Sequence, residues 1–354
     1  MLTKMTGHDL PDRHIISSDA SLRVALETLN SLSGEVMTLL VTDSGGRMVG
    51  TLTDGDVRRA LLAGVTLDRP VESAMHRAFR SVRQESDPAD IRRIRESGIS
   101  LLPVLDADGR IVSVIDLRRQ TTRLPVRAVL MAGGRGERLR PLTDSVPKPL
   151  LRVADRCIID INIESLQRCG IEDITVTVRY LAEHIERHFS STPVKCIRED
   201  EPLGTIGALS LLPAVDPQAS TLLMNSDLFT SISFEEFYLR HIETGADITI
   251  ATVPHTVSIP FAILSVDGDR VTGIEEKPTY THYANAGIYL IRNSLVNDMP
   301  QHRLDAPDFI AGAIGAGAKV SYFPISGTWL DIGTPADFRQ ACEVMRHHRN
   351  LSPL

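Results

Sequence analysis

The chain has 354 residues, of which 42% are hydrophobic and 23% charged, and its formal net charge at pH 7 is −7. This length suits two domains, and the acidic balance argues against a nucleic-acid partner, because phosphate backbones attract basic surfaces. No stretch approaches about 18 uninterrupted apolar residues and residues 1–11 lack the apolar core of a secretory signal, so we expect no membrane association and a cytoplasmic protein.

Residues 1–122 contain an internal repeat. Residues 38–54 read TLLVTDSGGRMVGTLTD, and 63 residues later residues 101–117 read LLPVLDADGRIVSVIDL. In both, an apolar run meets an aspartate and a Gly-Arg turn before a second apolar run, which predicts a strand, a tight turn and a strand. Helical patterns accompany these hairpins over residues 21–30, 55–63 and 87–97. We expect two α+β units, at about residues 10–66 and 67–122.

Residues 120–125 (QTTRLP) read as a linker, after which the pattern changes. Short apolar runs alternate with helical patterns, and the chain closes with an amphipathic helix. The predicted strands cover 126–131, 174–178 and 221–225, and the predicted helices 158–170, 181–189 and 335–346. Such alternation predicts βαβ units, so we expect residues 123–354 to form an α/β domain with a Rossmann-like, doubly wound sheet covered on both faces.

A glycine-rich turn follows the first strand of this second domain. Residues 132–150 read AGGRGERLRPLTDSVPKPL. Glycine lets the backbone approach a phosphate chain closely, and the backbone N–H groups can point at its oxygens. Cationic side chains lie in the same segment, at Arg135, Arg138 and Lys148. An NAD-binding turn would show GxGxxG spacing instead, so the pattern favours a triphosphate over a dinucleotide.

This segment resembles the signature GGxGxRLxPLTxxxPKPL of the sugar-phosphate nucleotidyltransferases and matches each of its defined positions. The resemblance implies a GT-A-like fold and the transfer of a nucleotidyl group to a sugar 1-phosphate with release of pyrophosphate. It also implies that the loop Ala132, Gly133, Gly134, Arg135 and Gly136 wraps the triphosphate. By the same resemblance Arg138 engages the α and β phosphates, and Lys148 reaches the phosphates of both substrates.

Further segments resemble the family in order and approximate spacing. The resemblance implies a nucleobase loop at residues 201–209 (EPLGTIGAL), metal-binding carboxylates in NSD and WLDIGTP, and sugar contacts in EEKP and NAGIY. The residues carried over are Glu201, Gly204 and Gly207 for the base; Asp227 and Asp331 for the metal; Lys277 for the sugar phosphate; and Glu276, Asn285 and Gly287 for the sugar. Two departures are Ser226, where the family usually has glycine, and residues 260–264 (PFAIL), where relatives often have Tyr-Gly.

The N-terminal repeat resembles a tandem pair of cystathionine-β-synthase-type (CBS) domains, commonly a sensor of adenine nucleotides. The first repeat carries the ribose-binding pattern of that family, with Thr53 and Asp56 at the polar positions. The second repeat has Asp116 and Arg119 there, so its site looks degenerate. We expect an adenine nucleotide effector at the first repeat and a homo-oligomer formed through the flanking helices. A dimerisation scaffold without ligand is the alternative.

From the resemblance we expect Mg²⁺, held by Asp227 and Asp331, to bridge the α-phosphate and the sugar phosphate. The attacking phosphate oxygen is already an anion, so no general base is needed. Two alternatives from other classes are a catalytically inactive sensor of nucleotide sugars or adenylates, and an NAD-dependent enzyme, which the glycine spacing disfavours.

The hydrogen-bond donors of a nucleobase must match the acceptors in the base loop, and this match indicates which base is bound. Guanine presents two adjacent donors, which suit a carboxylate such as Glu201, whereas thymine and uracil suit an amide better. Similar enzymes with an N-terminal CBS pair include guanylyltransferases that act on glucosamine 1-phosphate in nonulosonic (legionaminic) acid pathways of cell-surface polysaccharides. We expect GTP with an aminohexose or hexose 1-phosphate, such as glucosamine 1-phosphate or mannose 1-phosphate. Thymidylyl or uridylyl transfer to glucose 1-phosphate stays open.

Overall fold

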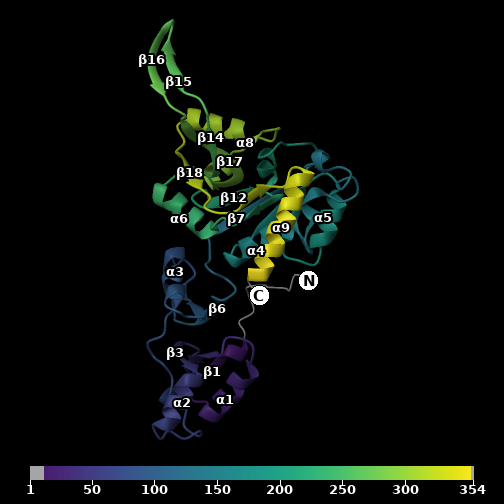
Figure 1. Ribbon diagram of the computed structural model, residues 1–354. Coiled ribbons are helices and arrows are strands. Elements are labelled where there is room, and N and C mark those ends of the chain that lie inside the picture. The colour runs from purple at the N-terminus through teal and green to yellow at the C-terminus, as the bar shows by residue number, and fades with distance from the viewer. Residues whose placement is uncertain (1–11, 352–354) are drawn as a thin grey trace. The chain divides into compact units, whose positions relative to one another are not determined.

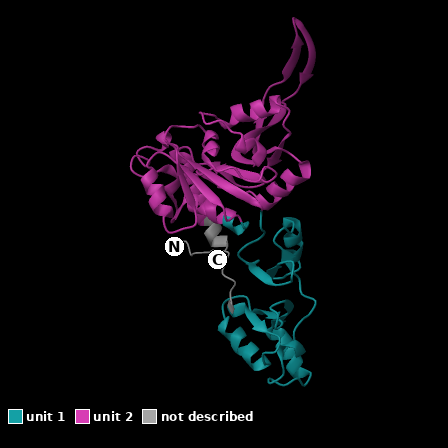
Figure 2. Ribbon diagram, turned by 180° about the vertical axis from the view of Figure 1, so that it is seen from behind, with its two compact units in different colours: residues 1–124, 167–170 teal, residues 125–166, 171–354 magenta. Residues whose placement is uncertain are grey.

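The computed structural model describes residues 12–351 and divides the chain into two compact units (Figure 2). The first unit runs to residue 124 and includes residues 167–170, and the second holds residues 125–166 and 171–354. Among the described residues, no helix is long and apolar enough to cross a membrane.

The first unit consists of the two expected repeats. Its elements are β1 (Ile15–Ser17), α1 (Leu22–Ser31), β2 (Thr38–Thr42), β3 (Met48–Thr53) and α2 (Asp54–Leu62), then β4 (Val82–Arg83), α3 (Pro88–Glu96), β5 (Leu101–Leu105) and β6 (Ile111–Asp116). Each repeat has a three-stranded sheet, in the orders β1-β2-β3 and β4-β5-β6. The two hairpins share one register 63 residues apart, since Leu40 pairs with Thr51 and Pro103 with Val114. The predicted hairpins and helices are therefore confirmed.

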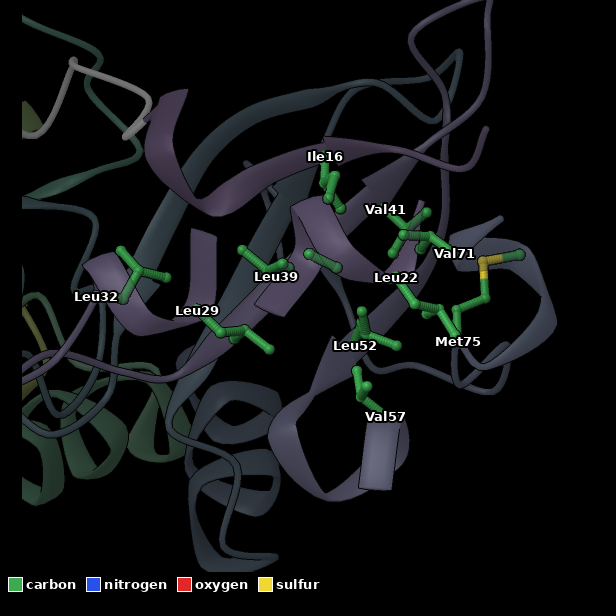
Figure 3. Close-up of a cluster of buried hydrophobic side chains, with 11 residues drawn as sticks. Ile16, Leu22, Leu29, Leu32, Leu39, Val41, Leu52, Val57, Val71 and Met75 are labelled. Carbon is green, nitrogen blue, oxygen red and sulfur yellow. The ribbon is translucent and has the colours of Figure 1, made fainter. Parts of the chain in front are cut away.

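The apolar positions of the first repeat form its own core. Leu22 and Leu29 from α1 pack against Leu39 and Leu52 from the hairpin, and all four are at most 1% exposed (Figure 3). The helical spacing in α1 and the alternation in β2 and β3 turn these side chains to one side. Ser21 caps α1 by accepting a hydrogen bond from the backbone N–H of Val24, so the helix begins one residue after the expected position.

The second unit is built on a seven-stranded sheet with the order β11-β10-β7-β12-β17-β14-β18. Its strands are β7 (Val126–Ala132), β10 (Ile174–Val178), β11 (Lys195–Arg198), β12 (Ser220–Asn225), β14 (Ile248–Ser258), β17 (Thr279–Arg292) and β18 (Val320–Pro324). Only β17 runs antiparallel to its neighbours in this sheet. The α/β fold class is confirmed, and the sheet is mixed.

Helices connect and cover these strands (Figure 1). They are α4 (Ile158–Arg168), α5 (Ala182–Phe189), α6 (Phe234–Thr244), α7 (Asn293–Asn297), α8 (Ala306–Gly315) and α9 (Pro335–Leu351). Val296 of α7 and Ile310 of α8 pack in one buried cluster with Val129 of β7 and Leu223 of β12. Three small antiparallel ribbons complete the described part of the unit: β8 (Arg152–Val153) with β9 (Arg156–Cys157), β13 (Leu228–Thr230) with β19 (Trp329–Asp331), and β15 (Ile263–Asp267) with β16 (Arg270–Glu275).

Candidate active site

The glycine-rich turn leaves the sheet at the carboxyl end of β7. Gly136 has a φ of +63°, a conformation that side chains rarely adopt, and a β-carbon there would lie 3.0 Å from Thr143 Cγ2. A β-carbon on Gly133 would lie 2.9 Å from Oε1 of Glu199. Gly134, by contrast, has open space where a side chain would be. Two of the three glycines therefore serve close packing, and the middle one leaves the backbone accessible to a ligand.

Two carboxylates and a lysine meet beside this turn. Lys148 is 9% exposed and donates a hydrogen bond through Nζ to Oδ2 of Asp227. The same Nζ lies 3.8 Å from Oδ1 of Asp331. The pairing of β13 with β19 places Leu228 opposite Asp331, which brings Asp227, the residue before Leu228, to the same end of the ribbon. Residues more than 100 positions apart are thus joined by one short antiparallel pairing.

The electrostatics of this cluster favour a bound cation. Burial, together with the nearby Asp227 carboxylate, raises the pKa of Asp331, while Lys148 and Arg138 oppose the rise. Arg138 is also in contact with the segment after Asp331, because a β-carbon on Gly333 would lie 3.0 Å from its Nη2. Oδ1 of Asp227 is buried and has no hydrogen-bond partner within residues 12–351. A buried carboxylate oxygen without a donor, beside a second carboxylate, fits a hard divalent cation with oxygen ligands.

An open cavity of about 470 Å³ lies at the carboxyl ends of β10 and β11, next to the glycine-rich turn. Arg135, Arg179 and Glu199 are among the residues that line it. In open α/β sheets, ligands bind outside the carboxyl ends of the strands, so this cavity is the candidate nucleotide site.

Glu199 is a candidate site residue that sequence analysis did not single out. It is 7% exposed, whereas Glu201, the expected base ligand, is exposed and does not line the cavity. Burial raises the pKa of Glu199, while the hydrogen bond from the backbone N–H of Leu203 and the charge of Arg179 act in the opposite direction. Glu199 is the first residue after β11, which ends at Arg198, and sequence analysis predicted no strand there.

Gly204 and Gly207, which we expected to lie against the nucleobase, pack against another segment of the chain in the structure. A β-carbon on Gly204 would lie 2.4 Å from the carbonyl oxygen of Leu304, and one on Gly207 would lie 2.8 Å from that of His302. The N–H of Gly207 already donates to the carbonyl of Leu304. These glycines let the loop pack against residues 302–304, so the Gly207 amide is not free for a nucleobase.

The expected sugar contacts fall into two groups. Gly287 of β17 adjoins the carboxylates, because a β-carbon there would lie 2.5 Å from Nδ2 of Asn225, two residues before Asp227. Asn285 accepts a hydrogen bond from the Gly287 N–H and donates one to the Tyr289 hydroxyl, at 2.9 Å each. Glu276 and Lys277 lie in the exposed segment between β16 and β17 and make no hydrogen bond or ion pair within the described residues. The structure does not bring these two residues to the carboxylates.

In the first unit, Thr53 and Asp56 form a capping box at the start of α2. Asp56 accepts hydrogen bonds from the backbone N–H and the hydroxyl of Thr53, at 2.8 and 2.6 Å. Burial acts to raise the pKa of Asp56, but these bonds and Arg59 lower it overall. The side chains of Thr53 and Asp56 therefore satisfy backbone groups at the N-terminus of α2. In the second repeat no helix follows β6, and Asp116 instead pairs with Arg118 at 2.9 Å.

The fold and the cluster define an α/β protein with a phosphate-type turn beside two carboxylates and a lysine. The chain belongs to the nucleotidyl transferase family, whose model matches residues 127–347. A CBS-domain model matches residues 9–63, which cover the first repeat. Members of this transferase family typically use a divalent metal ion, in keeping with the carboxylate pair.

Similar proteins include two mannose-1-phosphate guanylyltransferase subunits. The catalytic subunit beta of Danio rerio is 27% identical over 241 residues, 64% of this chain and 67% of that protein. The corresponding subunit of Xenopus tropicalis is 26% identical with the same coverage. The chain spans 61 to 67% of the length of such curated relatives.

Among solved structures, one described as a glucose-1-phosphate thymidylyltransferase from Bacillus anthracis has a TM-score of 0.51. It is 22% identical, and the match covers 62% of this chain and 95% of that one. At this identity the likeness concerns the fold alone.

Proposed function

We propose that the chain transfers a nucleotidyl group from a nucleoside triphosphate to a sugar 1-phosphate and releases pyrophosphate. The observation that carries the proposal is the contact of Lys148 with Asp227 and Asp331 beside the glycine-rich turn. Phosphoryl and nucleotidyl transfer need charge neutralisation and alignment more than covalent chemistry, and this cluster supplies both signs of charge. The family match and the guanylyltransferase relatives support this reaction class.

The side chains divide the work as follows. The open backbone at Gly134 binds the triphosphate, with Arg138 and Lys148 stabilising charge on the departing pyrophosphate. The sugar phosphate oxygen is an anion at neutral pH, so no residue has to remove a proton from it. Asn285 and Gly287 orient the sugar on β17, beside Asn225. We assign no step to Glu276 and Lys277, because they lie in an exposed segment.

We propose Mg²⁺ as the metal ion and Asp227 and Asp331 as its ligands. Carboxylate oxygens are the ligands that Mg²⁺ prefers, and Oδ1 of Asp227 lacks any other partner among the described residues. When bound, the ion would neutralise charge on the phosphates and act as a Lewis acid at the α-phosphorus. Lys148 would then be released from Asp227 to reach phosphate oxygens.

For the nucleobase we propose guanine, with Glu199 as the residue that reads it. Glu199 is a buried carboxylate that lines the cavity, and a carboxylate can accept from both N1–H and the N2 amine of guanine. The names of the relatives also favour GTP and a hexose 1-phosphate. We place the activity in cytoplasmic sugar-nucleotide biosynthesis.

The test is release of pyrophosphate from each of the common triphosphates with mannose, glucosamine and glucose 1-phosphates. We expect release with GTP in the presence of Mg²⁺ and none after chelation. Release only with UTP or dTTP would overturn guanine, and binding of nucleotides without any release would favour a catalytically inactive sensor.

For the first unit we propose an adenine nucleotide effector at Thr53 and Asp56 and contacts between copies through α1 and α2. The capping box leaves the positive end of α2 beside the expected ribose position. Apolar side chains are exposed on both helices, with Val24 at 46% and Leu62 at 85%. Calorimetric titration of the full chain with AMP, ADP and ATP tests the effector. Heat from none of them would favour the scaffold.

A further inference from the structure

Cys157, Asp160 and His188 form a second cluster of potential metal ligands in the second unit, and it shares no residue with the carboxylate pair. One ligand atom of each side chain lies within 4.8 Å of those of the other two. Nε2 of His188 lies 2.7 Å from Oδ1 of Asp160. Within the described residues, no other three Cys, His, Asp or Glu side chains come this close together. The fold therefore brings a thiol, a carboxylate and an imidazole to one point.

Regular elements of the second unit hold these three side chains. Cys157 ends β9 and lies opposite Arg152 of β8, Asp160 is in the first turn of α4, and His188 is in the last turn of α5. Buried apolar side chains anchor both helices next to the ligands: Ile159 and Ile163 in α4, and Ile185 and Phe189 in α5. Metal ligands on packed helices and strands are held more precisely than ligands on loops. The separation of the three donor groups is therefore set by the packing of the unit.

The three donor atoms differ in kind, which indicates the ion that would fit. Thiolate and imidazole ligands suit zinc, whereas Mg²⁺ prefers oxygen ligands alone. In a tetrahedral zinc site with ligand distances of ~2.0 to 2.3 Å, neighbouring ligand atoms lie roughly 3.3 to 3.6 Å apart. The atoms of Asp160 and His188 are somewhat closer than this, and the widest separation in the cluster is at most 4.8 Å. Side-chain shifts of ~1 Å would give the zinc geometry.

Burial and charge also suit a divalent cation at this point. Cys157 is 8% exposed, and the side chains of Asp160 and His188 are 17% and 27% exposed. An ion can therefore enter from solvent and is then largely shielded from it. Arg152 interacts with Cys157, but it is exposed, so its guanidinium can turn to solvent. One thiolate and one carboxylate then balance the charge of the ion.

We propose that Cys157, Asp160 and His188 bind one zinc ion through Sγ, a carboxylate oxygen and Nε2, with water as the fourth ligand. On binding, the thiol loses its proton to solvent. Nε2 of neutral His188 then presents its lone pair to the ion instead of contacting Asp160. This site is chemically distinct from the magnesium site proposed at Asp227 and Asp331.

The role of the ion is structural, because it ties α4 to α5 and to the β8–β9 ribbon. Asn162 lies in the same helix as Asp160, and its Nδ2 donates to the carbonyl oxygens of Ser226 and Leu228. These two residues flank Asp227 in the sequence. An ion that holds α4 therefore also stabilises the segment that carries a residue of the candidate active site.

The experiment uses the full chain without an affinity tag, stripped of metal with a chelator and returned to excess Mg²⁺, so that the carboxylate pair does not compete for the probe. Co²⁺ is the probe, because a cobalt–thiolate bond gives an intense charge-transfer band in the near ultraviolet. We expect this band with one Co²⁺ per chain, and its loss when Zn²⁺ displaces the cobalt. Cys157→Ser should remove the band and weaken Zn²⁺ binding by roughly 100-fold or more, since even changes around a metal ligand cost roughly 10 to 100-fold.

The melting temperature gives a second readout. Free Zn²⁺ at about 100 times its dissociation constant should raise the melting temperature of the wild-type chain by roughly 5 °C or more. Cys157→Ser and His188→Gln should lose most of this shift. If Cys157 only packs in the core, its variant would have a lower melting temperature without metal but the same zinc-dependent shift, and the site would be ruled out.

Cys169→Ser and His184→Gln are the matched controls, since Cys169 is the other buried cysteine and His184 is an exposed histidine of α5. Both should keep the cobalt band and the zinc-dependent shift. A wild-type chain without the band, a band that survives Cys157→Ser, or an unchanged zinc affinity of His188→Gln would each overturn the proposal. None of these readouts involves turnover, so they test this site separately from the proposed function.

Discussion

Nζ of Lys148 donates a hydrogen bond to one carboxylate oxygen of Asp227, while the other oxygen of Asp227 is buried with no hydrogen-bond partner among the described residues. A buried charge is costly unless it is paired, so Lys148 compensates only part of Asp227. The remaining acceptor and the neighbouring Asp331 leave the cluster ready for a further cation. Lys148 pairs with Asp227 when no ligand is bound. Under the proposed function, a cation that binds Asp227 would leave Lys148 available to the phosphates of the substrates.

Asp227→Asn should reduce turnover by roughly 1,000-fold or more, because it removes the charge of a metal ligand at the reacting phosphate. Nucleotide binding measured by calorimetry in the absence of metal should change little. Asp269→Asn, at an exposed aspartate in the turn between β15 and β16, is the matched control and should keep wild-type turnover. Turnover of Asp227→Asn within about tenfold of wild type would rule out the proposed ligand set.

Lys148→Ala should lower kcat by roughly 100-fold, the usual scale for loss of one transition-state charge contact. It should also raise the apparent affinity for Mg²⁺, since Nζ competes with the cation for Asp227. Steady-state kinetics over a magnesium titration measure both effects. A variant that needs more Mg²⁺ than wild type would contradict the competition between Lys148 and the cation.

Glu199→Gln should weaken the preference for GTP over UTP by roughly 10 to 100-fold in kcat/KM, because an amide cannot accept both guanine donors. Glu201→Gln is the control, because this substitution makes the same chemical change at an exposed position two residues away. Competition between the two triphosphates in one reaction gives the ratio directly. An effect confined to the Glu201 variant would restore the original assignment of the base ligand.

The contrast between Glu199 and Glu201 shows where sequence reasoning stops. The signature of residues 132–150 is contiguous, so its turn and cationic residues could be located without tertiary information. The base loop could not, because its orientation depends on packing of Gly204 and Gly207 against residues 302–304, which are distant in sequence. Glu201 begins this loop and Glu199 lies two residues before it, and only the fold decides which of the two is buried.

A second limit of sequence reasoning is that it does not tell which side chains of a predicted site are exposed to solvent. The order of the family's segments indicated the neighbourhood of Asn285 and Gly287, and the structure places Gly287 against Asn225. The resemblance predicted Glu276 and Lys277 in the same site, although in the structure they lie in the exposed segment between β16 and β17. Alternation of apolar and polar residues, as in residues 264–267 (LSVD), predicts a strand with one apolar face. It does not tell whether that face meets the same chain or another one.

Asp56→Asn should abolish adenine nucleotide binding to the first unit, because an amide presents a donor where the ribose hydroxyls need an acceptor. Its carbonyl oxygen can still accept from the Thr53 N–H, so the capping box of α2 is largely kept. Calorimetry with AMP measures the loss, and an unchanged melting temperature without ligand shows that the cap survives. Unaltered binding of AMP to this variant would show that Asp56 does not contribute to the effector site.

His241 should make the stability of the second unit depend on pH. The ring is 2% exposed, its Nε2 lies 2.9 Å from the Ser220 hydroxyl and its Nδ1 lies 2.8 Å from that of Thr249. Burial, with a smaller effect of Arg292, lowers the pKa of His241 from 6.5 to about 4, although Asp247 acts in the opposite direction. The unfolded chain therefore binds the proton first, and stability that is complete above pH 6.5 declines as the pH falls toward 4. Between pH 7 and pH 5 the free energy of unfolding should fall by about 2 kcal/mol from this group.

Urea titrations at the two pH values measure the loss. His241→Gln, which cannot take up the proton, should remove about that much of the pH dependence, and an equal slope in both proteins would show that His241 does not control it.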